Sequence, residues 1–434
     1  LKHHHLSDPK YQTSDPEFDP DDSELFIETW QSGLIVTTFH QFAYAIFSGK
    51  NSTLKRLPKI AGATVIFDEI QALPRRYWEA VGNAIMNISK GFDTRFIFMT
   101  ATQPYLVRKE DSLEMISPKV RSITLNRYEV SNHFLKPTSI TEFCSILKKA
   151  ITENPRLSRL IVLNRKKTVA GVISFLSANF PKLRLFALST NQTPRHRRQI
   201  LKQLNQCMKD EETVVLVSTQ IIEAGMDLDF PEIERDLAPI DSLIQTAGRC
   251  NRHGIQRGAI RIWNLVDERG SPLWKMVYDP ILIEVTSEVL GAHEAFSEEE
   301  ISRLLPSYFE KVRARSVSET PDELLRQEKY ETLDETFQLI PEDAPIQSVF
   351  VRASPKCQEI WDEYQNISEE ENPFRRKQLW NRMKGKFLDR VVQVRVRSWG
   401  EIERPFIKIE VSKETYDKRL GFLALPGNSG VFMI

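Results

Sequence analysis

The sequence predicts an α/β protein with two lobes, each built around a parallel sheet, followed by a helical segment and a small α+β region. Short apolar runs such as 63–67 and 214–217 have the composition of buried parallel strands. Polar residues follow each of these runs directly, at the strand end where open α/β sheets bind their ligands. Strands and helices alternate with short connections from about residue 160 onwards, which is the pattern of a doubly wound sheet.

Composition limits the class of protein. The 434 residues include 59 basic and 59 acidic side chains, so a surface for nucleic acid must be a local patch and not a property of the bulk charge. The four cysteines, Cys144, Cys207, Cys250 and Cys357, lie far apart and form no CxxC pair. This argues against a zinc site or a disulfide framework and fits a reducing compartment. Without an apolar run of membrane-spanning length or a visible signal peptide, we expect a cytoplasmic protein.

The chain begins with Leu1, and the histidines of LKHHHLSDPK follow immediately. Adjacent histidines point in different directions, so we interpret them as part of a loop in the middle of a larger polypeptide and not as a metal centre. Residues 7–24 are turn formers and acids, typical of a solvated loop. A strand over residues 34–39 then carries Thr37 and Thr38, which a β-branched strand end would favour in any case.

The run 63–67 predicts a buried strand with two carboxylates at its end, Asp68 and Glu69. Asp68 could hold magnesium through water, and Glu69 could orient and deprotonate a water that attacks a phosphate. The simpler alternative is an acidic pair that begins a helix. A second strand over Arg95–Met99 ends in Thr100-Ala101-Thr102, and the helix between the strands, 75–90, has apolar residues at core spacing.

The second lobe is predicted from strands over 160–163, 183–188 and 214–217, with helices over 168–178 and after Pro194. Asn164 and Arg165 follow the first of these strands. The basic run 195–198 fits phosphate contact and a solvated helix start equally well. Residues 103–138 are interpreted as the connection between the lobes.

The stretch 214–253 has the most specific pattern. Ser218 and Thr219 end its strand with hydroxyls and amides that suit a phosphate, Gly225 allows close backbone approach, and Asp227 suits a ribose hydroxyl. A helix predicted to begin near Asp241 then places three polar side chains on one face, where an amide and two guanidiniums suit a triphosphate; these are Gln245, Arg249 and Arg252.

Together, S-T-Q-x-x-E-A-G-x-D and Q-x-A-G-R-x-x-R resemble motifs V and VI of superfamily-two helicases. The flanking APIDSLIQ and GRCNRHG make the stretch similar to the CRISPR-associated helicase-nuclease of type I interference systems. D-E-x-Q followed by T-A-T resembles motifs II and III of that family. The resemblance runs from the N-terminus to about Trp263 and becomes diffuse beyond it.

The resemblance implies two RecA-like lobes that bind ATP and Mg²⁺ and move single-stranded DNA. It assigns Asp68 and Glu69 to the metal and the attacking water. Gly225, Asp227, Arg249 and Arg252 would bind the nucleotide, with Gln245 in the same catalytic group. The residues assigned to DNA are Thr37, Thr38, Asn164, Arg165, Ser218 and Thr219. Those assigned to coupling between nucleotide and DNA are Gln71, Thr100 and Thr102.

The chain after Trp263 is predicted to be helical over 279–335, with strands near 348–351, 391–396 and 406–411. A stretch at 374–387 mixes basic and aromatic residues, which would suit a single strand of nucleic acid but fits better an amphipathic helix packed through its rings. The predicted domains are a first RecA-like lobe over 1–128, a second over 129–268, a helical linker over 269–335 and an accessory C-terminal domain over 336–434.

Two parts that the resembling family normally carries are missing from these residues: a histidine-aspartate nuclease domain and a phosphate-binding GxxxxGK[ST] loop. The sequence Ser48–Ser52 is not such a loop, because Tyr44 stands where its first glycine is required. We therefore expect these residues alone to bind ATP poorly, with the missing parts supplied upstream or by a second polypeptide.

Two functions remain open. The first is a 3′-to-5′ DNA translocase of type I CRISPR interference, which degrades DNA together with a nuclease domain outside this chain. In this first function, ATP binding closes the two lobes on each other, and Arg249 and Arg252 complete the nucleotide site. The second is a catalytically silent module that docks on an RNA-guided surveillance complex and holds displaced DNA. An RNA helicase fits less well, because Gln71 and the long C-terminal extension depart from that class.

Overall fold

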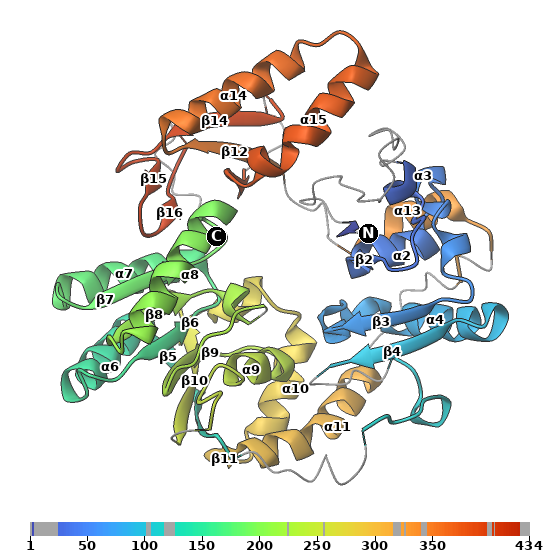
Figure 1. The fold of residues 1–434 in the computed structure, drawn as a ribbon. Helices are drawn as coiled ribbons and strands as arrows, with labels where there is room; N and C mark the ends of the chain where they lie inside the picture. Colours follow the sequence, from blue (N-terminus) through green and yellow to red (C-terminus); the bar gives the residue numbers. More distant parts are fainter. Residues whose placement is uncertain are drawn as a thin grey trace. The chain divides into compact units, whose positions relative to one another are not determined.

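The computed structural model describes residues 2–3, 25–100, 106–116, 126–223, 225–254, 257–315, 323–324, 327–339, 345–396, 402 and 404–425. The chain divides into two compact units, each assembled from separate segments. Unit 1 comprises Leu1–Met115, Ser316–Ala344 and Glu359–Leu388, and unit 2 comprises Ile116–Arg315, Pro345–Gln358 and Asp389–Ile434. Figure 1 labels the helices and strands of both. The four predicted domains are continuous segments, and that division stays a prediction.

Unit 1 contains two parallel strands, β3 (Thr64–Asp68) and β4 (Arg95–Met99), joined by α4 (Trp78–Phe92). Both strands lie where the sequence predicts them, but β3 is not the buried strand expected, because Phe67 alone is buried and Ile66 is 58% exposed. A second parallel pair, β1 (Lys2–His3) and β2 (Val36–Thr37), is much shorter than the strand predicted over 34–39. The other helices of the unit are α2 (Phe39–Phe47), α3 (Asn51–Leu54), α13 (Tyr330–Thr336) and α15 (Pro373–Leu388).

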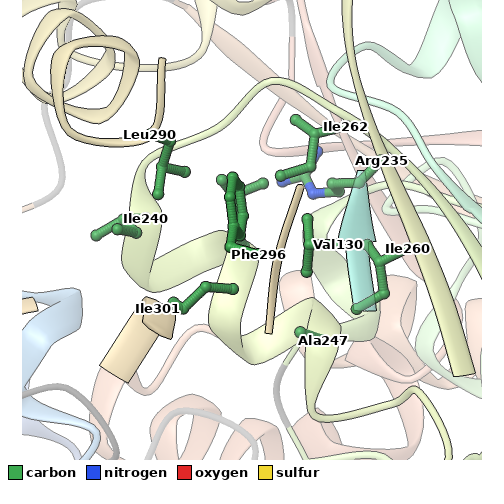
Figure 2. A pocket seen from close by; sticks show the side chains of 10 residues that line it. Val130, Arg235, Ile240, Ala247, Ile260, Ile262, Leu290, Phe296 and Ile301 are labelled. Carbon is green, nitrogen blue, oxygen red and sulfur yellow. The ribbon is translucent and has the colours of Figure 1, made fainter. Parts of the chain in front are cut away.

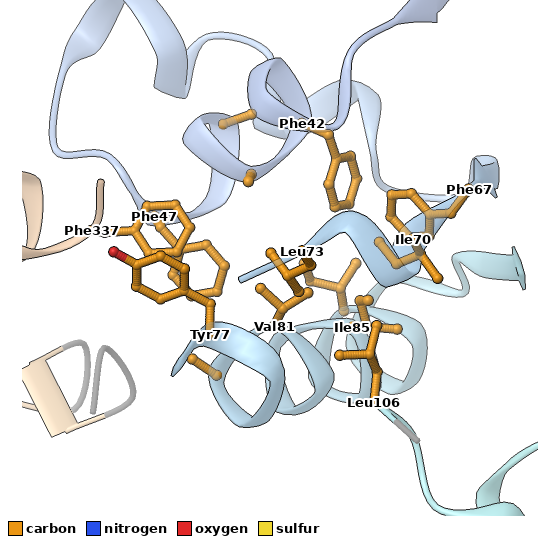
Figure 3. Packing of buried hydrophobic residues seen from close by; sticks show 14 of the residues in the cluster. Phe42, Phe47, Phe67, Ile70, Leu73, Tyr77, Val81, Ile85, Leu106 and Phe337 are labelled. Carbon is orange, nitrogen blue, oxygen red and sulfur yellow. The ribbon is translucent and has the colours of Figure 1, made fainter. Parts of the chain in front are cut away.

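The core of unit 1 lies where α2 and α4 pack against β3 and β4 (Figure 3). The apolar positions predicted to face the core on α4 do so, because Val81 and Ile85 are both 2% exposed. Phe337, which follows α13, stacks on Phe47 with ring centroids 4.5 Å apart. Residues near position 337 therefore complete a core that is otherwise built by the first hundred residues.

Unit 2 contains a seven-stranded sheet in the order β11-β5-β10-β9-β6-β8-β7. All neighbouring pairs are parallel except β11 with β5, which is an antiparallel edge. Its strands are β5 (Tyr128–Ser139), β6 (Arg159–Val162), β7 (Arg184–Leu188), β8 (Val214–Ser218), β9 (Glu232–Asp236), β10 (Gly258–Val266) and β11 (Ala295–Ser297). The helices are α6 (Ile140–Glu153), α7 (Lys166–Asn179), α8 (Pro194–Lys209), α9 (Ile240–Ala247), α10 (Pro280–Leu290) and α11 (Glu298–Ala314). The predicted α/β class with parallel sheets is confirmed.

Two strands of this sheet correct the sequence interpretation. β5 occupies the end of the stretch interpreted as a connection, where buried positions such as Tyr128, Val130 and Phe134 are separated by polar ones. β11 lies inside the stretch predicted to be helical, and its three residues are too few to give a periodic signal. Both lie at one edge of the sheet, where one-sided burial weakens the apolar pattern.

The C-terminal part of unit 2 is a three-stranded sheet in which β12 (Ile346–Arg352) lies between β13 (Val391–Arg395) and β14 (Phe406–Glu410). A short hairpin follows, β15 (Tyr416–Asp417) with β16 (Gly421–Phe422), and it contacts the loop before α8. The amide of Phe422 donates to the Asn191 carbonyl at 2.7 Å. Gly421 has a φ of +85°, and a Cβ there would lie 2.3 Å from the same carbonyl oxygen, so a side chain cannot fit.

The basic-aromatic stretch 374–387 is helix α15, and the rings of Trp380 and Phe387 pack inside unit 1, whereas Phe374 is 80% exposed. Phe387 lies 4.7 Å from Tyr364 between ring centroids, and Trp380 lies 5.8 Å from Tyr364. Tyr364 belongs to α14 (Pro355–Ser368). This is the arrangement expected of an amphipathic helix that packs through its aromatic face.

Over the part of the chain that the structure describes, no helix combines the length and the apolar character needed to cross a membrane.

Candidate functional site

The carboxyl end of β3 presents two carboxylates to solvent. Asp68 is the last residue of the strand and Glu69 the next, and both are exposed. Glu69 adopts a left-handed backbone (φ +56°, ψ +42°), which is uncommon for a residue other than glycine and costs about 1–2 kcal/mol. Its amide donates to the Met99 carbonyl at 3.0 Å, so the turn is anchored to the end of β4. A strained residue at a strand end is typical of a functional site.

Gln71 connects this turn to the end of the neighbouring strand. Its side-chain amide donates to a Glu69 carboxylate oxygen through Nε2, and its Oε1 accepts from the Thr100 hydroxyl at 2.5 Å. Gln71 is only 5% exposed, so its amide is held from both sides. The structure therefore brings Glu69, Gln71 and Thr100 into one hydrogen-bonded chain. Thr102 lies outside the described residues.

The oxygen donors here fit Mg²⁺ in kind, because this ion binds through one or two carboxylates, water and substrate phosphates. Asp68 and Glu69 supply two exposed carboxylates beside each other at the strand end. Among the described residues there is no cluster of three or more histidine, cysteine or acidic side chains that could form a closed metal site. The strand end therefore suits a metal that arrives with a phosphate ligand.

Thr38 has a local structural role. Its hydroxyl accepts from the Gln41 amide at 3.3 Å and caps the N-terminus of α2. Thr37 precedes it at the end of β2 and is half-buried. The contact of these two threonines with DNA phosphates stays a prediction.

In unit 2, Asn164 and Arg165 are engaged in contacts within the unit. The Asn164 amide donates to the Leu237 carbonyl at 2.8 Å and accepts from Arg235 at 2.8 Å. Arg165 donates to the Leu273 carbonyl at 3.0 Å. These side chains hold the ends of strands and loops together, and a contact with DNA stays a prediction for both.

Ser218 and Thr219 end strand β8 inside the unit. The Ser218 hydroxyl is fully buried and donates to the Thr219 carbonyl at 2.8 Å, and the Thr219 amide donates to the Leu188 carbonyl at 3.0 Å. The DNA contact assigned to both residues by resemblance stays a prediction. In the structure, these polar groups hold the end of β8 against the end of the neighbouring strand β7.

The prediction that Gln245, Arg249 and Arg252 share one face of a helix is wrong. Helix α9 ends at Ala247, with Gly248 as its C-cap, so only Gln245 lies within it. Arg249 and Arg252 follow in a segment of turns, in which the amides of Arg249 and Cys250 donate to carbonyls three residues earlier. The helix also begins one residue before Asp241, after Pro239.

The two arginines are nevertheless tied to the loop that follows β8. Arg249 donates to the Glu223 carbonyl at 2.7 Å, and Arg252 forms an ion pair with Asp227 at 3.4 Å. Gly225, in the same loop, has a φ of +69°. The structure thus places the loop that carries Gly225 and Asp227 beside the segment that carries Arg249 and Arg252.

A buried ionic group behind this segment was missed by the sequence analysis. Arg235 is completely buried and pairs with the Glu223 carboxylate at 2.9 Å, while it also donates to Ser242 and to the Tyr278 hydroxyl. Ser242 donates to the other Glu223 oxygen at 2.8 Å. The available signal was a charge pattern, since E-I-E-R-D places ionic residues in a strand flanked by apolar segments.

Figure 2 shows Arg235 beside the apolar core of the unit, close to Val130, Ile260 and Ile262. The void there is about 10 Å³, room for at most a single water. The void is therefore part of the core and not a ligand site.

Burial changes the acid–base chemistry of this region. Burial raises the pKa of Asp236 to about 7, although the adjacent Arg235 and three backbone hydrogen bonds oppose the change. Burial likewise raises the pKa of Glu223 against the opposing effect of Arg235. Burial also raises the pKa of Asp241 to about 6. Desolvation is thus the largest cause of the raised pKa of each of these three carboxyls.

Residues 157–255 match the family model for the C-terminal part of the CRISPR-associated nuclease/helicase Cas3. The Cas3 of Haloferax volcanii is 22% identical over 436 aligned positions, which cover 73% of this chain and 46% of that protein. A shorter alignment with the Cas3 of Thermus thermophilus reaches 38% identity over 88 positions, covering 18% of this chain and 10% of the relative. The chain thus spans less than half the length of these two relatives.

Solved structures of Cas3 have a fold similar to that of this chain. T. fusca Cas3 with AMPPNP superposes with a TM-score of 0.64 at 17% identity, covering 90% of this chain and 57% of that one. A chain of a CRISPR RNA-guided surveillance complex in a pre-nicking state gives a TM-score of 0.63, also at 17% identity, over 92% of this chain and 61% of that one. The resemblance inferred from the motifs is confirmed by the family model over residues 157–255, and the fold of the chain is similar to that of solved Cas3 structures.

Proposed function

We propose that this relative of Cas3 is the motor part of an ATP-dependent, 3′-to-5′ single-stranded DNA translocase in type I CRISPR interference. It acts in the cytoplasm with a nuclease domain supplied outside these residues, and it works on DNA exposed by an RNA-guided surveillance complex. The presence of a similar chain in such a complex and the family relation support the partner.

The observation that carries the proposal is the hydrogen-bonded chain from Glu69 through Gln71 to Thr100. A carboxylate that activates water must be held in a fixed orientation toward the phosphate. Gln71 supplies that orientation and also contacts the end of the next strand. A module that only docks would need no such positioned carboxylate, so this arrangement favours the motor over the silent alternative.

In this proposal Asp68 holds the magnesium that arrives with ATP and that neutralises phosphate charge. Glu69 orients the attacking water and accepts its proton. Asp227 binds the ribose, with Gly225 leaving space for the nucleotide beside it. Arg249 and Arg252 stabilise the charge that develops on the transferred phosphate, a role suited to forked guanidiniums.

Gln245 is proposed to orient the terminal phosphate or the water. Six residues are proposed to contact the phosphates of the DNA strand. Two of them, Thr37 and Thr38, lie in unit 1, and four lie in unit 2: Asn164, Arg165, Ser218 and Thr219. The side chains of Asn164, Arg165 and Ser218 are engaged in internal hydrogen bonds, so in unit 2 we propose that backbone amides near these positions make the phosphate contacts. Thr102 is proposed to act with Gln71 and Thr100 in coupling.

The 434 residues contain no GxxxxGK[ST] sequence. Because that loop cradles the β and γ phosphates, we propose that hydrolysis by these residues alone is negligible and requires a phosphate loop supplied on the same or a second polypeptide. DNA-stimulated turnover by the 434 residues alone, abolished by Glu69→Gln, would contradict this requirement.

The test of the motor uses the protein together with its phosphate loop. Glu69→Gln should lower DNA-stimulated ATP hydrolysis by roughly 10²–10⁴-fold, the contribution of a positioned general base. Glu79→Gln, an exposed acid in the first turn of α4, is the matched control and should leave the rate unchanged. If Glu69→Gln retains the full rate, the assignment fails and the docking alternative stands.

A further inference from the structure

A cavity of about 570 Å³ lies in unit 2, between α8 and the C-terminal sheet. Its size is within the range of pockets that hold small ligands, roughly 300–1,000 Å³. One wall is apolar, with Ile200 on α8 and Val351 on β12. None of its lining residues belongs to the site assigned to ATP or DNA.

The charged side chains that line the cavity are all basic. Arg195 and Lys202 line it from α8, and Arg390 and Lys418 from the C-terminal segment, whereas no carboxylate is among the lining residues. Across the described part of the chain, Arg195, Lys202 and Lys418 form no ion pair. Because no carboxylate is among the lining residues, these cations give the cavity a positive potential.

The acidic residues that adjoin Arg390 and Lys418 in sequence are engaged elsewhere. Asp389, beside Arg390 in sequence, pairs with Arg198 at 2.5 Å. Asp417 accepts from two backbone amides of its own turn, that of Arg419 at 2.7 Å and that of Leu420 at 2.8 Å. Neither carboxylate lines the cavity, so neither neutralises its cations directly.

Two helices begin at the wall and add to the positive potential. Thr193 is the N-cap of α8, and Ser354 and Cys357 lie at the start of α14. Although burial opposes it, hydrogen bonds from Ser354 and Arg390 hold the pKa of the Cys357 thiol below its usual range. The same surroundings that favour a thiolate favour any other anion.

We propose that this cavity binds a small phosphate-bearing anion, of the class of pyrophosphate or a mononucleotide, at a place separate from the residues assigned to ATP. The phosphates would lie among the four cations, and an organic part, if present, would lie against Ile200 and Val351. The inference rests on the cavity alone and does not depend on the proposed motor.

A small anion fits better than a nucleic-acid strand. Strands are held by aromatic platforms on which successive bases stack. The two aromatic rings at this cavity are committed to each other and to the backbone: His196 lies 2.9 Å from the Tyr416 hydroxyl and 2.9 Å from the Lys418 carbonyl oxygen, and Tyr416 is 4% exposed.

The test is calorimetric titration of the 434-residue chain with pyrophosphate, and separately with AMP, at fixed ionic strength. The double variant Lys202→Gln/Lys418→Gln should weaken pyrophosphate binding by about tenfold or more, since two charge-assisted contacts are lost. The matched control is Lys148→Gln/Lys182→Gln, which removes the same charge from exposed positions outside the cavity and should leave the affinity unchanged.

A second readout locates the ligand. Pyrophosphate should slow alkylation of Cys357, which lines the cavity, severalfold, but not that of Cys207, which lies near the far end of α8. Absence of saturable binding, equal losses in both double variants, or unchanged alkylation of Cys357 would each overturn the proposal. A single-stranded oligonucleotide that displaces pyrophosphate through the same lysines and binds more tightly would overturn it in favour of a strand site.

Discussion

The charged residues at the strand end of unit 1 are exposed to solvent, whereas the ionic group of unit 2 is buried. Asp68 and Glu69 are exposed, and Glu69 is oriented by a hydrogen-bonded chain through Gln71 to Thr100. The loop of unit 2 that carries Glu223 is held from behind by Arg235, which is completely buried. Groups that must meet a ligand can stay hydrated, whereas the scaffold that fixes a loop can be buried. The first should therefore govern rate and the second stability.

The largest expected effect is on stability. Arg235→Met leaves the Glu223 carboxylate buried without its cation, and breaking a buried pair in this way costs about 3–5 kcal/mol. Chemical denaturation of the chain, followed by a probe in unit 2, measures the cost. Arg184→Met is the matched control, because Arg184 pairs with Glu212 at 2.9 Å but is 63% exposed, and its loss should cost no more than about 1 kcal/mol. Equal costs for the two variants would remove the distinction between buried scaffold and surface pair.

The next effect concerns pH. The pKa of Asp236 is raised to about 7 in the folded chain, so between about pH 4 and pH 7 the folded state holds a proton that the unfolded state has lost. This contribution to stability is complete at low pH and is lost as the pH rises through 7. Asp236→Asn, which keeps a neutral side chain at all pH values, should flatten this part of the unfolding profile. An unchanged slope would mean that Asp236 is already ionised in the fold.

The buried residues also show where the sequence was informative. The strand ends at Asp68, Thr100 and Ser218 were predicted because apolar runs followed by polar residues give a strong local signal. Helix α9 was predicted too long, because the motif spacing suggested one helical face and Gly248 was not interpreted as its end.

The charge pattern E-I-E-R-D marks Arg235 as unusual in a strand, but it does not identify the partners of that side chain. Its partners Glu223, Ser242 and Tyr278 are brought together only by the sheet and the loop after β10, and no local pattern encodes those contacts. Glu69, Gln71 and Thr100 were assigned from short motifs, yet their hydrogen-bonded order depends on β3 and β4 being neighbours. Spacing along the chain thus identifies the participants, while tertiary structure decides which of them touch.

The smallest expected effect is at Gln71. Gln71→Ala removes the amide that orients Glu69 but not the carboxylate itself, so the rate of DNA-stimulated hydrolysis should fall by about tenfold, roughly 1.4 kcal/mol of activation free energy. Because Gln71 acts through Glu69, combining it with Glu69→Gln should add little. Gln71→Glu should not rescue the rate, since a second carboxylate would repel the first. A full rate in Gln71→Ala would show that the relay has no positioning role.

In the proposed motor, the carboxylates of unit 1 and the guanidiniums of unit 2 act on one reaction. DNA-stimulated ATP hydrolysis, measured in the presence of the phosphate loop for Glu69→Gln, Arg252→Ala and the double variant, tests it most directly. Groups that act as a unit give non-additive losses, so the double variant should be no more than a few-fold slower than the worse single variant. Losses that multiply, or an Arg252→Ala variant with the full rate, would contradict a shared role in nucleotide turnover.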